Sequence, residues 1–144
     1  MVVGMASNKL AAELLDQVMS LSGRVAGIMR DGLEALDLTE TLANLIWLVD
    51  PAVDPVPLRK LAARLHYDPS NVTLLCSRLE EKGLAERRPH PRDGRVRTLV
   101  LTKKGVQVRN RLLRQVTARS PLGVLDAAEQ RQLQVTLTKV LGTI

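Results

Sequence analysis

The sequence contains almost no aromatic residues and a single cysteine. Of its 144 residues one is Trp, one is Tyr and none is Phe, whereas hydrophobic residues as a whole make up 45%. The core must therefore be built from Leu, Val, Ala and Met, a composition that favours helices packed on helices. The lone Cys76 excludes an internal disulfide and suits a reducing cytoplasm.

Signals of several other protein classes are absent as well. No apolar run approaches the roughly 18 residues that span a bilayer, and the start, MVVGMASNK, lacks the regions of an export signal. We therefore expect a cytoplasmic protein without a membrane partner. The sequence has no glycine-rich phosphate loop, no paired catalytic carboxylates, no nucleophile with a partner histidine and no zinc-type Cys/His spacing. We expect neither an enzyme nor a metal or cofactor.

Positive charge is concentrated in the middle of the chain. The net charge is +6, but residues 59–114 carry 15 Lys and Arg against five Asp and Glu, a local net of +10, whereas the rest has a net of −4. Such segregation is typical of a surface that binds a polyanion, although a merely solvated basic face would give the same count. The length suits one domain, which we expect to span residues 1–144.

Long amphipathic helices are expected at both ends. Over residues 8–36, apolar residues recur at alternating spacings of three and four, the pattern of a helix that packs lengthwise on others. They are Ala11, Leu14, Val18, Leu21, Val25 and Ile28. Near the other end, Thr102 is the expected N-cap of a helix reaching about Arg119, and Asp126 with Glu129 forms a capping-box pattern. The last helix carries Leu133, Leu137, Val140 and Ile144 along one side.

The middle of the chain begins with three shorter helices. Thr39 is the expected N-cap of the first, which Asp50-Pro51 ends. The second, over residues 58–65, has apolar residues at i, i+3, i+4 and i+7. His66-Tyr67 form the next turn. Asp68 as N-cap and Pro69 at the first helical position then mark the start of the third helix, which continues to Lys82 and has Gly83 at its C′ position.

Two strand-like segments follow, over residues 84–88 and 97–101. Asp93-Gly94 between them predicts a two-residue type I′ turn, which requires positive φ at both central residues. Two helices joined by a tight turn and followed by a hairpin describe a helix-turn-helix with a wing.

The helix over residues 69–82 has two different faces. Its 100° step places Val72, Leu75, Cys76 and Leu79 toward the core. The opposite side suits a major groove, since Ser and Thr bond phosphates or base edges, Asn pairs with adenine, Arg pairs with guanine, and an exposed Leu contacts a thymine methyl. The candidate contacts are Ser70, Asn71, Thr73, Leu74, Ser77 and Arg78. An ordinary amphipathic helix would show the same pattern, and the arginine-rich hairpin beside it decides in favour of DNA.

The hairpin supplies further candidates, Arg88, Arg92 and Arg95. A β-ribbon tipped with arginine can follow the DNA backbone or enter a minor groove, where the negative potential is strong. Asp93 suits DNA poorly unless its carboxylate holds the Arg95 guanidinium in place. A role of Asp93 in the turn alone is the alternative.

Together these elements resemble the MarR family of bacterial winged-helix transcriptional regulators. The resemblance rests on five pieces in order: Leu61-Ala62, DPSNVT at 68–73, RLEEKGL at 78–84, RRPHPRDGR at 87–95 and LTKKG at 101–105. It implies a mainly α fold with a small β-wing. Residues 39–102 would form the winged helix-turn-helix that binds DNA, and residues 8–36 and 103–144 would supply long dimerisation helices. It also implies that Asp93 and Arg95 form the wing motif, with Arg95 in the minor groove.

The expected function is that of a homodimeric, sequence-specific regulator, most often a repressor, on a pseudo-palindromic operator in double-stranded DNA. Many family members respond to small, often phenolic or anionic effectors. The sequence identifies no effector-binding residues, and its scarcity of aromatics, Trp47 and Tyr67 aside, speaks against a phenolic effector. Some members sense oxidants through cysteine, a role that a buried Cys76 suits poorly. The alternative function is a low-specificity nucleoid-like or RNA-binding protein, which competition with unrelated duplex DNA and RNA would distinguish.

Overall fold

Helices dominate the structure, as the sequence predicts. The computed structural model describes residues 2–142, with side chains from residue 4 onward. The elements are α1 (Val2–Asp31), the 3-10 helix η1 (Glu34–Leu36), α2 (Glu40–Leu48), α3 (Leu58–Leu65), α4 (Pro69–Glu81), β1 (Ala85–His90), β2 (Asp93–Leu101), α5 (Lys103–Arg119), the 3-10 helix η2 (Pro121–Val124) and α6 (Ala127–Leu141). The expected mainly α fold with a small β-hairpin is confirmed.

Four side chains cap their helices as expected. Thr39, Asp68, Thr102 and Asp126 each accept a backbone N–H at the start of α2, α4, α5 and α6. Asp126 and Glu129 bond reciprocally, so the capping box is complete. Each of these caps is a local hydrogen bond that a short stretch of sequence can specify.

The first helix differs from its expected bounds. α1 spans Val2–Asp31 rather than residues 8–36, and a turn followed by η1 replaces the expected last five residues. Gly32 in that turn lowers helix propensity, and the change of direction buries Leu33 and Leu36 in the core. The core therefore ends α1 where the apolar pattern alone would have continued it.

The hairpin turn is the clearest correction. Pro91 and Arg92 form the turn, and neither Asp93 nor Gly94 has the positive φ that the expected type I′ turn requires. Proline favours the earlier position because its ring fixes φ near −65°. The turn is also closed by a hydrogen bond in which His90 Nδ1 accepts the Arg92 backbone N–H at 3.1 Å.

As a result the strands are longer than expected and β2 bulges. β1 covers Ala85–His90 and β2 covers Asp93–Leu101, in place of residues 84–88 and 97–101. Pro89 pairs with Arg97, whereas His90 pairs with Asp93, so residues 94–96 lie opposite no residue of β1. Arg95 thus projects from a bulge and not from a regular ladder.

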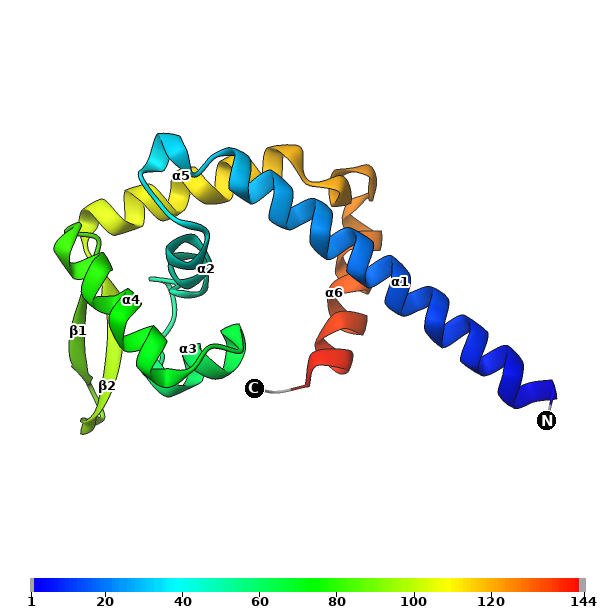
Figure 1. Cartoon of the computed structure of the whole chain (residues 1–144), viewed down its shortest axis with the longest axis horizontal. Coiled ribbons are helices and arrows are strands. Elements are labelled where there is room, and N and C mark those ends of the chain that lie inside the picture. The colour runs from blue at the N-terminus through cyan, green and yellow to red at the C-terminus, as the bar shows by residue number, and fades with distance from the viewer. Residues whose placement is uncertain (1, 143–144) are drawn as a thin grey trace.

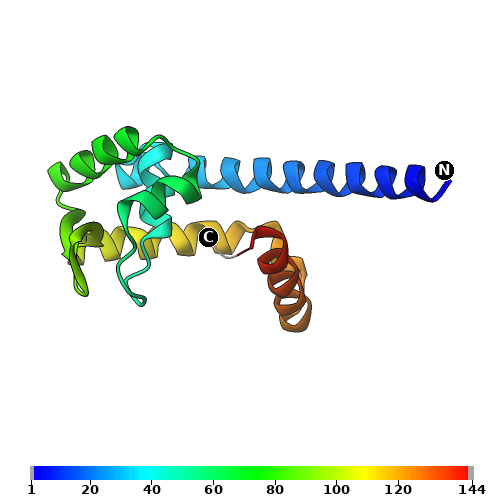
Figure 2. The same ribbon diagram turned by 90° about the horizontal axis from the view of Figure 1, so that it is seen from below.

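The core lies where α2, α3, α4 and the base of the hairpin meet α5 and the last turns of α1. α5 runs along one edge with α2 beside it, and the hairpin tip points away from α5 (Figure 1). The N-terminal half of α1 extends beyond the rest of the molecule in both views (Figure 2). The largest fully buried side chains include Leu42, Leu45, Ile46, Leu61, Leu75, Leu79, Leu99 and Leu112.

A close contact at Gly105 joins the start of α5 to the end of α4. A Cβ added at Gly105 would overlap the carbonyl oxygen of Leu84. The same carbonyl accepts the Thr102 backbone N–H at 3.0 Å, and Thr102 Oγ1 donates to the carbonyl of Gly83 at 2.6 Å. Only glycine lets α5 begin this close to the chain that leaves α4.

We predict that Gly105→Ala lowers the free energy of unfolding by roughly 3 kcal/mol, since overpacking against a hydrogen-bonded backbone costs about 1–3 kcal/mol or more. Urea denaturation followed by circular dichroism measures this change. Gly4→Ala is the matched control, because an added methyl there meets no atom within 4 Å. Equal denaturation midpoints for Gly105→Ala and the unmodified protein would contradict the contact.

Candidate nucleic-acid interface

α4 has the inner and outer faces that the sequence predicts. Val72, Leu75, Cys76 and Leu79 are buried. The outer face carries the six candidate contacts, of which five are exposed and one is partly buried: Ser70, Asn71, Thr73, Leu74 and Arg78, with Ser77 partly covered. The Leu74 side chain is 51% exposed, so this face presents an apolar group among polar ones.

Asp68 fixes the start of this helix. Its Oδ1 accepts the hydroxyl of Ser70 at 2.6 Å and the backbone N–H of Ser70 at 2.8 Å. These two hydrogen bonds hold the pKa of the Asp68 carboxyl below its ordinary value, and the bond from the hydroxyl has the larger effect. The carboxylate thereby caps the first turn of α4 through both the backbone and the side chain of Ser70.

The hydroxyl hydrogens of the outer face are used within the protein. The Ser70 hydroxyl donates to Asp68, Thr73 Oγ1 donates to the Pro69 carbonyl at 3.1 Å, and Ser77 Oγ donates to the Thr73 carbonyl at 3.2 Å. Within the part of the chain that the structure describes, the side chains of Asn71 and Arg78 make no such bond. On this face the free N–H donors accordingly belong to Asn71 and Arg78, and the hydroxyl oxygens of Ser70 and Thr73 remain as acceptors, whereas that of Ser77 accepts Arg87 Nη2.

Three hairpin arginines pair with nearby acids. They are Arg87 with Glu80 (2.6 Å), Arg88 with Glu86 (3.0 Å) and Arg92 with Asp54 (3.2 Å). The first pair is about two-thirds buried and, with a bond from Arg87 Nη2 to Ser77 Oγ, fixes β1 against α4. The other two pairs are mostly exposed and are of a kind worth roughly 0–1 kcal/mol. Arg88 and Arg92 can therefore exchange their acids for a stronger anion.

Asp93 acts on Arg95 differently from the expectation. Its Oδ1 accepts the backbone N–H of Arg95 at 3.2 Å, and the carboxylate–guanidinium bond is not formed. The hydrogen bond shapes the bulge that carries Arg95 and leaves the exposed guanidinium without an internal partner among residues 2–142. The expected ion pair is not formed, and Asp93 does not take the expected place in the turn either, because Pro91 and Arg92 form the turn and Asp93 bonds within the bulge of β2.

One cation of the basic middle segment has a structural role that the sequence does not reveal. Arg109 donates from Nε and Nη2 to the Trp47 carbonyl at 3.2 and 3.1 Å, and its side chain is only 12% exposed. This bond ties the end of α2 to α5. The two bonded residues lie 62 positions apart in the sequence, so no short stretch of sequence predicts this bond.

The remaining candidate residues belong to the packed interior. Trp47 and Tyr67 pack against the core, and the Tyr67 hydroxyl accepts Asn44 Nδ2 at 3.1 Å.

Within residues 2–142, no three His, Cys, Asp or Glu side chains gather as a metal site. Over the same range, every helix is too short or too polar to cross a bilayer. Cys76 is buried, and burial raises the pKa of its thiol to about 11.

Comparison with known proteins connects this geometry to one family. Residues 52–96, which contain α3, α4 and most of the hairpin, match the MarR family model. No curated protein matches the chain in sequence. CouR from Rhodococcus jostii RHA1 bound to p-coumaroyl-CoA is 25% identical, with a TM-score of 0.71 over 88% of each chain.

Two similar structures contain DNA. A mutant MarR from E. coli complexed with operator DNA is 24% identical, with a TM-score of 0.64 over 90% of this chain and 94% of that one. The transcriptional repressor CouR bound to a 23-mer DNA duplex is 22% identical, with a TM-score of 0.65 over 88% of this chain and 90% of that one. The shared fold therefore covers nearly the whole chain, far beyond the segment matched in sequence.

We predict that Cys76 reacts slowly with thiol reagents, because the thiolate is the reactive form and a pKa of about 11 leaves almost none of it near pH 7.5. Labelling with dithionitrobenzoate should be at least a hundredfold slower in the native protein than in 6 M guanidinium chloride. The unfolded protein is the internal control. Comparable rates in the two conditions would contradict the burial of this residue and reopen a redox role.

Proposed function

Because the chain is a winged-helix protein of the MarR family, we propose that it is a homodimeric, sequence-specific transcriptional repressor. The observation that carries the proposal is that α4, whose outer face is exposed, lies beside the arginine-bearing hairpin (Figure 1). A helix that fits a major groove beside a basic ribbon is an arrangement that reads duplex DNA. Residues 39–102 would bind DNA, and α1, α5 and α6 would form the dimer.

Each candidate residue receives a role in this proposal. The outer face of α4 enters a major groove, where Asn71 and Arg78 donate to base edges or phosphates and Leu74 contacts a thymine methyl. Ser70 and Thr73 offer hydroxyl acceptors to the same groove, whereas Ser77, which already accepts Arg87 Nη2, would contact the groove only through the rest of its surface. Arg88 and Arg92 follow the DNA backbone, and Arg95 enters the minor groove from the bulge that Asp93 shapes.

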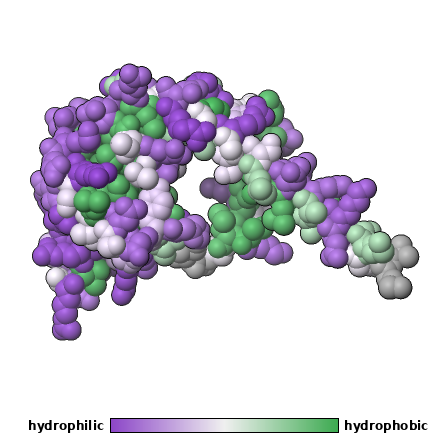
Figure 3. All heavy atoms as spheres, in the orientation of Figure 1, coloured by the Kyte–Doolittle hydropathy of each residue, from purple (hydrophilic) through white to green (hydrophobic). Residues whose placement is uncertain are grey.

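The case for a homodimer comes from apolar side chains that the single chain leaves uncovered. α6 buries no residue of its own, and α1 buries none between Gly4 and Ile28. Figure 3 shows hydrophobic side chains gathered over α6. The exposed apolar residues are Met5, Leu10, Leu14, Leu15, Val18 and Met19 on α1, and Val135, Leu137, Val140 and Leu141 on α6. Exposed patches of this kind mark association surfaces.

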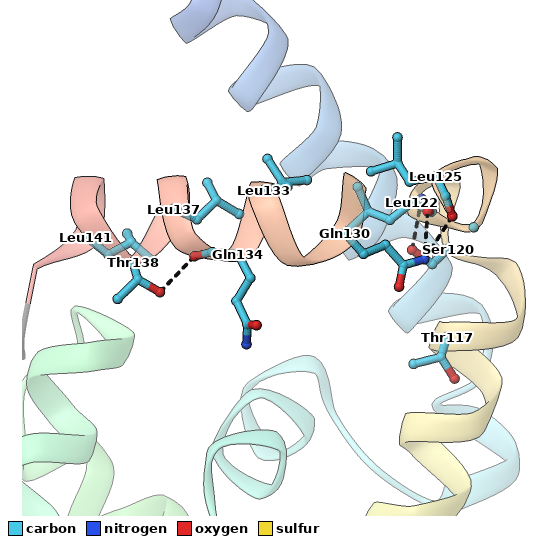
Figure 4. Close-up of a pocket in the computed structure, with 11 residues that line it drawn as sticks. Thr117, Ser120, Leu122, Leu125, Gln130, Leu133, Gln134, Leu137, Thr138 and Leu141 are labelled. Atoms are coloured by element: carbon cyan, nitrogen blue, oxygen red, sulfur yellow. Dashed lines mark hydrogen bonds between the residues drawn. The ribbon is translucent and has the colours of Figure 1, made fainter. Parts of the chain in front are cut away.

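An open depression of about 510 Å³ continues this surface, between the end of α5, η2 and α6. Leucines from η2 and α6 line it, and Gln130 bonds back to η2 at its end (Figure 4). Leu133 and Leu137, which the sequence places on the seam of the last helix, are among them, whereas Ile144 of that seam lies outside the described residues. We propose that apolar side chains of a second copy fill the depression.

Similarity to solved structures extends the proposal to repression and to the relief of repression by a ligand. The CouR structure that is 22% identical to this chain is described as a transcriptional repressor bound to DNA, and the CouR structure that is 25% identical is bound to p-coumaroyl-CoA. We propose the same sign of regulation here, with release from DNA by a small-molecule effector. p-Coumaroyl-CoA is the first compound to test.

For the dimer, we predict that Leu14→Asp with Leu137→Asp yields a monomer, because the two charges would lie in the apolar surface that a second copy covers. Sedimentation equilibrium at micromolar concentration gives the mass. Leu74→Asp is the matched control, since Leu74 is an equally exposed leucine on α4 and should leave the dimer intact. A dimer in the doubly substituted protein, or a monomer in the unmodified one, would contradict the proposed dimer surface.

For DNA, we predict that selection from a random duplex library yields a pseudo-palindrome with half-sites about 10 base pairs apart, or a multiple of that spacing. Affinity should fall steeply with salt, and Arg95→Ala should weaken binding at least roughly tenfold, as expected for loss of a charged contact. The selection is repeated with p-coumaroyl-CoA present. Unaltered affinity of Arg95→Ala would refute the role of the wing.

Competition gives the control for this experiment. A specific regulator keeps its site against a large excess of unrelated duplex, because specific binding is typically stronger by 10³-fold or more. Equal binding to the selected site, to unrelated duplex and to RNA would instead identify a nucleoid-like or RNA-binding protein.

A further inference from the structure

Two depressions beside the hairpin differ in charge balance. One, of about 290 Å³, is lined by Lys60, Arg64 and His90 together with Asp54, which also pairs with Arg92 at 3.2 Å. The other, of about 240 Å³, lies between the start of α3 and β2. It is lined by Pro57, Leu58, Arg59, Arg95, Val96 and Arg97, which include three arginines and no acid. We call this second depression the arginine notch.

The arginines of the notch lack the partners that neighbouring arginines have. Arg87, Arg88 and Arg92 each pair with a carboxylate. Within residues 2–142, the side chains of Arg59, Arg95 and Arg97 make no ion pair and no hydrogen bond. Three like charges around one small depression repel each other, and each guanidinium keeps five unused N–H donors. An anion in the notch would remove the repulsion and satisfy the donors.

The backbone holds the notch in a fixed shape. Pro57, just before α3, forms an isolated bridge with Thr98 of β2. Thr98 is fully buried, and its hydroxyl donates to the Arg88 carbonyl at 2.9 Å. The start of α3, which carries Arg59, is thereby attached to the strand that carries Arg97. Two arginines from separate elements are thus presented together, which favours forked recognition of an anion.

We infer that the arginine notch binds one phosphodiester of the DNA backbone, with Arg59 and Arg97 as its ligands, beside the minor groove that Arg95 enters. The inference rests on the proposed function and adds two residues to the interface. Arg95 lines the notch, so an anion held there lies next to the minor-groove contact proposed for that residue. A phosphodiester offers two unesterified oxygens to the forked guanidinium donors. Binding it would fix the hairpin along the strand without reading sequence.

The test measures affinity for the selected operator at several salt concentrations. Arg59→Ala and Arg97→Ala should each weaken binding roughly tenfold and leave the order of preferred sequences unchanged, because a phosphate contact carries no sequence information. The double variant should lose less than the product of the two single losses, since both residues hold one phosphate. Because each protomer of the dimer would lose one phosphate contact, the salt slope of the double variant should be shallower by about 1.8, or about 0.9 for each phosphate.

Arg111→Ala is the matched control. Arg111 is an exposed arginine on α5 that lines a depression shared with Asp37 and Glu81. Its loss should leave both the affinity and the salt slope as they are in the unmodified protein. A loss equal to that of Arg59→Ala would mean that total charge, and not the notch, sets affinity, which would overturn the inference.

Chemical substitution of the DNA locates the phosphate itself. Neutral methylphosphonates placed one at a time along the operator should weaken binding of the unmodified protein at one position near each wing. The same position should have no further effect on the double variant. Full affinity of both single variants would refute the notch while leaving the repressor proposal standing.

Inorganic phosphate alone tests for a small-anion site. If it shifts the side-chain NMR signals of Arg59 and Arg97 while the variants bind DNA normally, the notch takes a free anion and the inference fails. Failure of the unmodified protein to select any duplex would instead refute the proposed function, a result that needs no notch variant.

Discussion

The interface depends on the junction where α4, the hairpin and α5 meet. Gly83, with φ of +71°, turns the chain out of α4, and the carbonyl of the next residue, Leu84, accepts the Thr102 backbone N–H across the hairpin base. Gly105 then lets α5 start in direct contact with the same carbonyl. A side chain at Gly105 would push α5 away from this carbonyl, whereas one at Gly83 would strain the positive φ that turns the chain. The relative position of the reading helix and the wing is therefore set by backbone contacts a few residues long.

A second link joins α2 to the same long helix. Arg109 ties the end of α2 to α5, and Lys82 at the end of α4 pairs with Asp37 at 2.9 Å in the connection between α1 and α2. α5 is therefore attached to the hairpin base at its first turn and to α2 at its middle. Since α5 continues into the uncovered apolar surface of η2 and α6, the packing of two copies would set the distance between two reading helices. The geometry of the dimer would then determine the spacing between the operator half-sites.

Local features of the fold could be predicted from the sequence, whereas contacts between distant segments could not. The caps at Asp68, Thr102 and Asp126 each involve residues two or three positions apart, so the pattern and the hydrogen bond coincide. The hairpin turn was misplaced because Asp93-Gly94 and Pro91-Arg92 are both good turn sequences. The choice between them depends on the His90 bond and on the bulge in β2. The candidate contacts on α4 followed from helical periodicity alone, but the arginine notch joins residues of α3 and β2 that nothing in the sequence brings together.

The positions of the acids decide which cations of residues 59–114 are paired in the fold and which are not. Asp37, Asp50 and Asp54 lie before that segment in the sequence, yet in the fold they reach Lys82, Arg109 and Arg92. Glu80 pairs with Arg87, and Glu86 pairs with Arg88. Acids therefore neutralise cations at the helix junctions and along β1, while Arg59, Arg95 and Arg97 pair with no acid among residues 2–142. A uniformly basic segment would attract a polyanion anywhere along its length. Over the same described residues, the pairing leaves unpaired arginines on both parts of the proposed interface, Arg78 on α4 and the three arginines of the notch.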